Sequence, residues 1–505
     1  MAAMPTFAFD NTYARLPGGF FVRATPAEAP APQLLFLNTD LAAELGLDAH
    51  ALQGDAGAAL FSGNTLPPGA EPIAQSYAGH QFGGFSPQLG DGRALLLGEV
   101  IDRRGQRRDI AFKGSGRTVF SRGGDGLAAV GPMLREVLIG EAMHALGVPT
   151  TRALAVAATG ARVQREGALP GAVLTRVAAS HLRVGSFQFF AARGDLERLA
   201  TLADYALARH DPDLAGVPDR HLQLLRRVAE RQATLIAQWL NLGFIHGVMN
   251  TDNMTISGET IDYGPCAFME AYDPATVFSS IDHHGRYAYG NQAAIARWNL
   301  ARLAEALMPL MVDSPDDEAA VQRAVADCMA VIDAFPAWHD AALRRGQAAK
   351  LGLGGGGDTA DAALADDWLA LLQAHRVDFT LAWRRLADAA AGDANPLRAL
   401  FGEQPAAVNP WLDRWQARCA QIDTANPALT AARADHMRQV NPLVIPRNHR
   451  VEDALAAAQG DGDLTPFDDL LAALRRPFDD DPAAARFAEP APAALSAGYR
   501  TFCGT

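Results

Sequence analysis

Residues 246 to 264 read His-Gly-Val-Met-Asn-Thr-Asp-Asn-Met-Thr-Ile-Ser-Gly-Glu-Thr-Ile-Asp-Tyr-Gly. In this stretch Asn253 and Asp262 stand on either side of a short apolar segment, 255–261, that we predict to be a hairpin. An amide oxygen and a carboxylate are hard ligands suited to Mg²⁺ bridging nucleotide phosphates. Asp, Asn and Gly are also common in turns, so the pattern alone leaves a structural role open.

The spacing is similar to that of a protein kinase catalytic loop, in which His-Arg-Asp precedes a metal-binding Asn and a second metal-binding Asp follows. His246 and Asn253 keep this spacing. Val248 occupies the position of the kinase base, and a valine can neither accept a proton nor orient a hydroxyl. Asp252, the only carboxylate in the loop 246–253, is our candidate proton acceptor, with a turn residue as the alternative. The loop thus predicts a metal-triphosphate site without phosphoryl transfer by the usual route.

The composition is that of a soluble globular protein, with 49% hydrophobic and 20% charged residues in 505. The length suggests about three domains. No apolar run approaches a membrane span and no targeting segment is visible at the N-terminus, so we expect a cytoplasmic protein without membrane contact. A net charge of −13 argues against nucleic-acid binding. The four cysteines lack metal-ligand spacing. We expect a monomer, although nothing in the sequence determines the oligomeric state.

Hydrophobic patterning divides the chain into a mixed first part and a helical second part. Two strands, 93–100 and 109–113, form a predicted hairpin, the segment 132–146 a helix, and 153–158 and 172–177 two further strands. The later predicted helices are 196–208, 221–242, 293–312, 317–334, 360–390 and 452–474.

This order predicts an α+β, protein-kinase-like bilobal fold, with a small sheet-plus-helix lobe before a large helical lobe. We expect three regions: an N-terminal lobe with its extension at 1–178, a helical lobe with the catalytic loop at 179–435, and a helical tail at 436–505. The sequence leaves open whether the helices from about 300 to 500 give structural support, recognise substrate or carry the chain terminus to the cleft.

Lys113, at the end of a predicted strand, and Glu136, in the following helix, have the order of the kinase pair that holds nucleotide phosphates. Taken singly, each is more often a solvated surface residue. Their combination with the loop at 246–264 favours the functional interpretation, because the strand, the helix and the loop then all indicate the same nucleotide site.

Three further groups are candidates for nucleotide contact. Glycines let backbone N–H groups approach phosphate oxygens, and arginines bind phosphates with two parallel hydrogen bonds. The three groups are Gly90, Gly92 and Arg93; Asp125 and Gly126 in a glycine-rich loop; and Arg176 and Arg183. The alternative is an ordinary turn for the first group, a flexible loop for the second and surface salt bridges for the third.

Together these segments resemble the selenoprotein O family over most of the chain. The resemblance is carried by Gln88–Arg93, Phe112–Gly116, Gly123–Gly126, His246–Asn253 and Ile261–Pro265, and by the later Asp282–Tyr287, Asn441-Pro442 and Cys503 near the C-terminus. Family members are pseudokinase-fold protein adenylyltransferases. The resemblance implies that ATP binds in reverse orientation and that AMP is transferred to Ser, Thr or Tyr hydroxyls of proteins with loss of pyrophosphate.

The resemblance also implies roles for individual residues. Lys113 and Arg176 would hold the distal phosphates, and Glu136 would orient Lys113. Asn253 and Asp262 would bind Mg²⁺ or Mn²⁺, and Asp252 would accept the proton. The nucleotide would further be lined by Gly90, Gly92, Arg93, Asp125, Gly126 and Arg183. The protein substrates, the preferred metal and the use of other nucleotides, such as UTP for UMP transfer, stay open.

In the family, the C-terminal Cys can pair with a Cys in the loop after the Asp-Tyr-Gly motif. Here the segment we compare, 276–280, has no Cys, so a bond between Cys266 and Cys503 is our hypothesis.

Two other functions compete with AMP transfer. A phosphotransferase with an atypical base is disfavoured because Val248 replaces the usual Asp. A catalytically silent nucleotide-binding scaffold is disfavoured because both metal ligands are retained.

Overall fold

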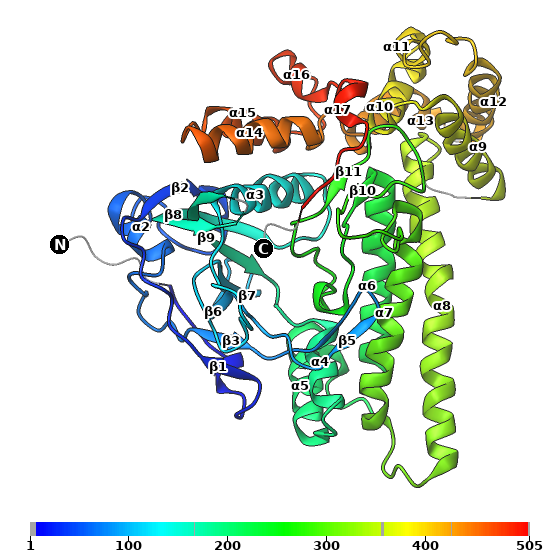
Figure 1. Cartoon of the computed structure of the whole chain (residues 1–505). Helices are drawn as coiled ribbons and strands as arrows, with labels where there is room; N and C mark the ends of the chain where they lie inside the picture. The colour runs from blue at the N-terminus through cyan, green and yellow to red at the C-terminus, as the bar shows by residue number, and fades with distance from the viewer. Residues whose placement is uncertain (1–6, 166, 355–357, 426, 503–505) are drawn as a thin grey trace.

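A computed structural model of the chain describes residues 7–165, 167–354, 358–425 and 427–502. Figure 1 shows a small lobe built on a sheet, and beside it a larger lobe of long helices. The predicted α+β, protein-kinase-like bilobal architecture is therefore confirmed.

The small lobe contains an antiparallel sheet in which the described residues form seven strands, in the order β1-β3-β6-β7-β9-β8-β2. The predicted hairpin is β6 paired with β7, and Lys113 is the last residue of β7. The strands are β1 (Phe21–Arg23), β2 (Gln33–Leu37), β3 (Ile73–Gln75), β6 (Ala94–Ile101), β7 (Arg107–Lys113), β8 (Arg152–Gln164) and β9 (Ala168–Ala178). A separate hairpin is formed by β4 (Gly79–Gln81) and β5 (Gly84–Ser86).

Alternating side chains of β7 bury both faces of the sheet, as the two-residue period of a strand requires. Ile110 and Phe112 pack in one cluster with Phe61 of α2 (Gly54–Phe61), which lies near the short α1 (Thr39–Glu44). Ala111 belongs to the cluster on the other face, which includes Leu134 of α3 (Val130–Ala145). The helix α3 packs on β8 and β9 of the same sheet, and this places Glu136 within reach of Lys113 at the end of β7.

The C-terminal helices return to the small lobe and cover α3, as Figure 1 shows for α14 (Asn448–Gly460) and α15 (Thr465–Leu474). The Gln459 side chain accepts a hydrogen bond from the Gly131 N–H at 3.1 Å, in the first turn of α3. Arg475 pairs with the buried Glu141 at 3.0 Å. This part of the tail therefore supports the helix that positions Glu136.

The large lobe begins after β9, and its longest helices, α6 and α8, pack against each other with α7 beside them (Figure 1). Its helices are α4 (Val184–Ala191), α5 (Leu196–His210), α6 (Arg220–Leu242), α7 (Gln292–Leu307), α8 (Glu318–Lys350), α9 (Thr359–His375), α10 (Phe379–Ala390), α11 (Asn395–Ala399), α12 (Asn409–Ala425) and α13 (Pro427–Val440), followed after α15 by α16 (Ala485–Ala488) and α17 (Ala493–Ser496). The short strands β10 (Phe244–Ile245) and β11 (Ala267–Phe268) pair and flank the loop with its metal-ligand pattern.

Two segments predicted as single helices are each two. The segment 360–390 is broken where Arg376 adopts a left-handed conformation at the end of α9 and the Asp378 carboxylate accepts the Leu381 N–H of α10 at 2.8 Å. The segment 452–474 is broken before α15, whose first turn holds Pro466. Both breaks contain residues that are typical of helix ends. The spacing of apolar residues does not reveal them.

Two helix ends and one hairpin also differ from the prediction. The helix expected at 317–334 continues through Pro336 to Lys350, and the one expected at 293–312 ends at Leu307 before a 3₁₀ turn. The hairpin predicted from Thr255 to Ile261 is wrong. Thr255 instead bridges to Arg183, and Thr260 bridges to Thr150. The segment therefore pairs with other parts of the same chain rather than with itself.

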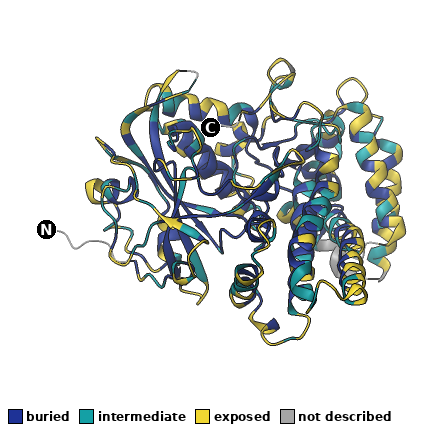
Figure 2. Ribbon diagram, turned by 60° about the horizontal axis from the view of Figure 1, so that its bottom comes forward, coloured by how far each residue is buried: buried dark blue, intermediate teal, exposed yellow. Residues whose placement is uncertain are grey.

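Figure 2 shows buried residues concentrated along the sheet and on the inward faces of the helices, with exposed residues on outer faces and loops. Within the described residues, no helix is both long enough and apolar enough to cross a bilayer.

Candidate active site between the two lobes

A cavity of about 330 Å³ lies where the small lobe meets the loop after α6. Its walls combine charged side chains from both lobes with a few apolar ones. The predicted site residues that line it are Gly92, Arg93, Lys113, Glu136, Arg176, Arg183, Asp252, Asn253 and Asp262.

The Lys113 ammonium connects the lobes. It donates to the Glu136 carboxylate of α3 and, at 2.6 Å, to Asp262 Oδ1 of the large lobe. The side chains of Lys113 and Glu136 are almost fully buried. A buried lysine flanked by two carboxylates has a fixed rotamer, so its charge is aimed at one place in the cavity.

Two arginines extend this positive wall. Arg176, in β9, donates from Nη1 to Asp262 Oδ1 at 2.7 Å. Arg183, just before α4, lies 3.6 Å from Asp91 and 4.0 Å from Asp262 Oδ2, and its guanidinium covers the Tyr77 ring at 4.5 Å. These planar cations suit bidentate binding of phosphate.

Asp262 is the centre of this cluster and has an unusual backbone, with φ = 63°. Burial by itself would raise the pKa of Asp262, but the charges of Lys113, Arg176 and Arg183 outweigh it and hold the pKa well below its usual range. Asp262 is therefore a carboxylate at any physiological pH.

The catalytic loop is held by hydrogen bonds to main-chain atoms. The His246 ring is buried against Trp239, and its Nε2 lies 2.9 Å from the Ile261 carbonyl oxygen, next to Asp262. Burial lowers the pKa of His246, so the neutral ring donates this bond. The Asn253 amide nitrogen donates to the Val248 carbonyl at 3.0 Å, which leaves its oxygen available as a metal ligand.

Asp252 borders the cavity and is mostly buried. Burial raises its pKa to about 6, against the lowering effect of a hydrogen bond from Gln81 Nε2 to Asp252 Oδ2 at 3.1 Å. A carboxylate with a pKa near 6 is a stronger base than an exposed aspartate and is still largely ionised at neutral pH. Val248, at the position of the kinase base, also lines the cavity and contributes only methyl groups.

Three predicted nucleotide contacts lie outside the cavity lining. Gly90 packs against Phe120. The Asp125 carboxylate receives two hydrogen bonds from Arg165, at 2.8 and 3.1 Å, and these are the main cause of its lowered pKa. Gly126 packs against Gly116 in the same glycine-rich loop.

Other residues of the lining were not predicted, among them Tyr77, Gln81, Phe82, Asp91 and Asn250. Asp91 and Asn250 lie inside motifs that the sequence analysis did single out. Tyr77, Gln81 and Phe82 precede any recognisable motif, so only the fold brings them to the site.

A metal ion at this site fits the residues present. No three His, Cys, Asp or Glu side chains group as metal ligands in the part of the chain that the structure describes. Asn253 and Asp262 would supply one oxygen each, and Mg²⁺ commonly takes its other ligands from phosphates and water.

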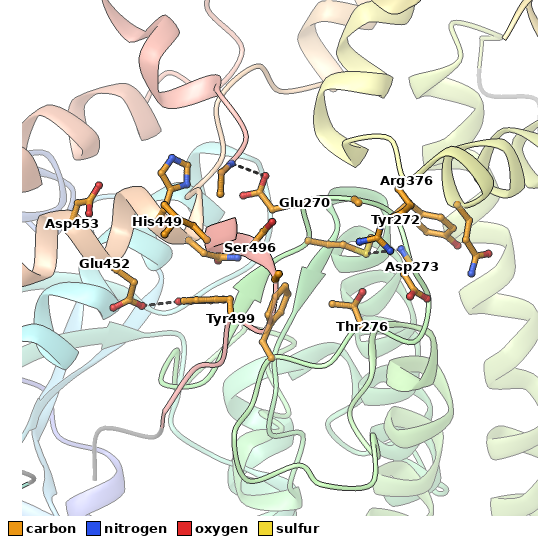
Figure 3. A pocket seen from close by; sticks show the side chains of 18 residues that line it. Glu270, Tyr272, Asp273, Thr276, Arg376, His449, Glu452, Asp453, Ser496 and Tyr499 are labelled. Carbon is orange, nitrogen blue, oxygen red and sulfur yellow. Dashed lines mark hydrogen bonds between the residues drawn. The ribbon is translucent and has the colours of Figure 1, made fainter. Parts of the chain in front are cut away.

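A second, larger cavity of about 520 Å³ lies between α14, the C-terminal segment 491–499 and the segment 269–278 (Figure 3). Its rim is acidic, with Glu270, Asp273, Glu452 and Asp453, and Tyr499 donates to Glu452 at 2.6 Å. None of the predicted site residues lines it, so its size alone does not make it the active site.

Cys266 is fully buried, and its thiol donates to the Tyr263 carbonyl at 3.3 Å. Burial raises the pKa of Cys266 to about 12, which disfavours the reactive thiolate. Its predicted partner, Cys503, lies outside the described residues. Thr501, two positions before Cys503 in the sequence, donates from its hydroxyl to the Pro265 carbonyl at 2.6 Å beside the cavity.

Comparison with known proteins identifies the family. Residues 4–475 match the family model described as protein adenylyltransferase SelO. A protein nucleotidyltransferase YdiU of Chromobacterium violaceum is 62% identical over 480 residues, covering 95% of this chain and 98% of the relative. Proteins of the same name from Cereibacter sphaeroides and Rhizobium leguminosarum are 58% and 56% identical, each covering 99% of this chain, and 100% and 97% of their own lengths. The chain belongs to the protein adenylyltransferase SelO family and is a nucleotidyltransferase.

Proposed function

We propose that this nucleotidyltransferase moves AMP from ATP to Ser, Thr or Tyr hydroxyls of proteins, with release of pyrophosphate and with Mg²⁺ or Mn²⁺ required. The observation that carries the proposal is the position of the base. Asp252 supplies a carboxylate to the cavity, while Val248 occupies the place from which a kinase base would act on the terminal phosphate. The proton acceptor is therefore Asp252, which occupies a different place in the cavity from the base of a phosphoryl-transferring kinase.

The cations then bind the leaving group. Lys113 and Arg176 lie together on Asp262, and we assign them to the β- and γ-phosphates of a nucleotide in reverse orientation. Arg183, on the other oxygen of Asp262, is assigned to the phosphates nearer the acceptor. Charge that develops on pyrophosphate as it leaves is stabilised by these fixed cations, an effect of several kcal/mol per well-placed group.

In the transfer step, the acceptor hydroxyl loses its proton to Asp252, its oxygen bonds to the α-phosphorus, and the bond from that phosphorus to the bridging oxygen of the β-phosphate breaks. Asn253 and Asp262 would hold a divalent cation, which supplies Lewis-acid stabilisation of the phosphate oxygens when bound. Glu136 keeps the Lys113 ammonium in place.

The proposal includes Gly92 and Arg93 as nucleotide contacts within the cavity. Gly90, Asp125 and Gly126 belong to the glycine-rich segments around it, and we propose that they contact the base or ribose. We also propose that the enzyme acts as a cytoplasmic monomer, with protein substrates and without nucleic-acid partners.

The test is incubation of the protein with ATP labelled at either the α- or the γ-phosphate. Acid-stable label on protein from the α-position alone, dependent on Mg²⁺ or Mn²⁺, is the expected result. Label from the γ-position alone would establish a phosphotransferase, and no label from either position would favour a silent nucleotide-binding scaffold.

A further inference from the structure

The hairpin of β4 and β5 reaches from the small lobe onto the catalytic loop. Its turn consists of Phe82 and Gly83, both with positive φ, 52° and 88°. This is the two-residue turn whose twist matches paired strands, and it normally demands glycine or asparagine. A phenylalanine in this conformation is costly, so contacts elsewhere must stabilise the hairpin.

Those contacts are made with the catalytic loop, by three successive hairpin residues. The His80 N–H donates to Thr251 Oγ1 at 2.7 Å, and the Phe82 N–H donates to Asn250 Oδ1 at 3.1 Å. Between them, the Gln81 side chain donates to Asp252 Oδ2 at 3.1 Å. The hairpin and the loop are therefore held in one register around Asp252.

The large lobe fixes the two outer contacts. The Thr251 hydroxyl donates to Gln188 of α4 at 2.7 Å, and the amide nitrogen of Gln188 donates to the His80 ring at 2.8 Å. The Tyr287 hydroxyl donates to Asn250 Oδ1 at 2.7 Å. Because Gln188 and Tyr287 hold these two contacts, the hairpin is a rigid support for Gln81. The hairpin keeps both contacts when Gln81 is replaced.

The two oxygens of the Asp252 carboxylate have different surroundings. Oδ2 accepts the bond from Gln81, whereas Oδ1 is buried and has no hydrogen-bond partner among the residues that the structure describes. Gly79 approaches Oδ1 so closely that a Cβ at position 79 would lie 2.6 Å from it. The carboxylate cannot rotate freely between Gly79 and Gln81.

We infer that Gln81 is a positioning residue for AMP transfer: it donates to Asp252 Oδ2 while Oδ1 lies buried against Gly79, and these two contacts fix the orientation in which the carboxylate meets the acceptor hydroxyl. The inference rests on the proposed role of Asp252 as proton acceptor. A neutral amide suits this task, because a Lys or Arg at the same place would fix the carboxylate but weaken it as a base. Orientation of a base within hydrogen-bond reach is what proton transfer requires.

The test replaces Gln81 by Met, which keeps the length of the side chain and removes the donor. We expect kcat for AMP transfer to fall about 10- to 100-fold, with KM for ATP changed less than about 2-fold. The matched control is Gln223→Met, because Gln223 donates to Asp219 at 2.7 Å in the same type of pair on the exposed side of α6. This variant should keep the wild-type kcat.

A double-mutant cycle separates positioning from a general structural effect. If Gln81 acts through Asp252, Gln81→Met should cause no further loss of residual rate in an Asp252→Asn background. An unchanged kcat in Gln81→Met, an equal loss in both backgrounds, or a loss confined to KM for ATP would each overturn the inference. Absence of AMP transfer by the wild-type protein would instead overturn the proposed function, and the inference with it.

Discussion

Lys113 Nζ lies 2.6 Å from Asp262 Oδ1, so a single ion pair joins the last residue of β7 in the small lobe to the residue before Tyr263 in the large lobe. Arg176 shares the same carboxylate oxygen at 2.7 Å. Asp262 Oδ1 therefore holds both proposed phosphate-binding cations, and Oδ2, 4.0 Å from Arg183, is the oxygen that would face the proposed metal ion.

Replacement of Asp262 by Ala should reduce AMP transfer by at least about 100-fold, because it removes a proposed metal ligand and releases Lys113 and Arg176. Transfer rates at saturating Mg²⁺ and ATP give the measurement. The variant Asp204→Ala serves as control, because Asp204 is an exposed carboxylate that pairs with Arg220 far from the cavity. Activity of Asp262→Ala within about 2-fold of wild type would remove Asp262 from the site.

Lys350 offers a pH-dependent prediction about stability. Lys113 and Lys350 are the only lysines in the chain, and both are buried. Burial lowers the pKa of Lys350 from 10.5 to about 7, and its ammonium lies 5.0 Å from the centre of the Trp383 ring. Between these pH values the unfolded chain binds more protons than the native one, so the contribution of Lys350 to stability rises with pH from 7 to 10.5.

Lys350→Met should therefore raise the free energy of unfolding at pH 7 by roughly 2 to 4 kcal/mol, and this advantage should shrink toward pH 10. Urea unfolding of both proteins at several pH values measures the difference. Arg345→Met, an exposed cation on the same helix, should change stability little at any pH. A Lys350→Met advantage that does not depend on pH would show that the lysine is not titrating in this window.

Arg447 holds three parts of the large lobe together. It is completely buried and pairs with Glu270 at 2.7 Å and with Asp378 at 2.6 Å. Arg447→Met leaves both carboxylates without their cation, and the free energy of unfolding should fall by about 3 to 5 kcal/mol. Arg450→Met, which loses an exposed hydrogen bond to the Arg486 carbonyl at 3.1 Å and a long contact of 3.7 Å to the exposed Glu489, should cost less than about 1 kcal/mol. Equal effects of the two replacements in urea unfolding would contradict this assignment.

Cys266 should react slowly with thiol reagents in the folded protein, because its thiol is buried and its pKa is raised to about 12. Peptide mapping after brief labelling, with and without urea, gives the measurement, and Cys266→Ser identifies the peptide. Rapid labelling of native Cys266 would be inconsistent with its burial. The hypothesis of a bond from Cys266 to Cys503 is tested on oxidised protein by mapping without reductant, and free thiols at both positions would rule it out.

Much of the cavity was predictable because its charged residues sit in motifs with fixed spacing. Lys113, Glu136, Asn253 and Asp262 each stand at the end of a strand, within a helix or in a loop that hydrophobic periodicity can place. The order of these strands, helices and loops along the chain can also be read from the sequence. That order determines which elements meet in the fold, and so which of these residues come together. The bilobal fold was predicted for the same reason.

The hairpin of β4 and β5 was not predictable, because its strands are three residues long and its turn is Phe-Gly rather than Asn-Gly. Contacts with residues 250–252, about 170 positions away, stabilise it. The hairpin predicted at 255–261 failed because the residues that bridge to this segment, Arg183 and Thr150, lie far from it in the sequence. Pro336 shows the same limit: packing of α8 against α6 sustains a helix that local rules would end.

We propose that ATP lies reversed in the cavity, with its α-phosphate toward Asp252. A crystal structure of the protein with Mg²⁺ and a non-hydrolysable ATP analogue would show the orientation of the nucleotide. We expect the α-phosphorus nearest to Asp252, with the β- and γ-phosphates on Lys113 and Arg176. A nucleotide with its γ-phosphorus nearest to Asp252 would contradict it.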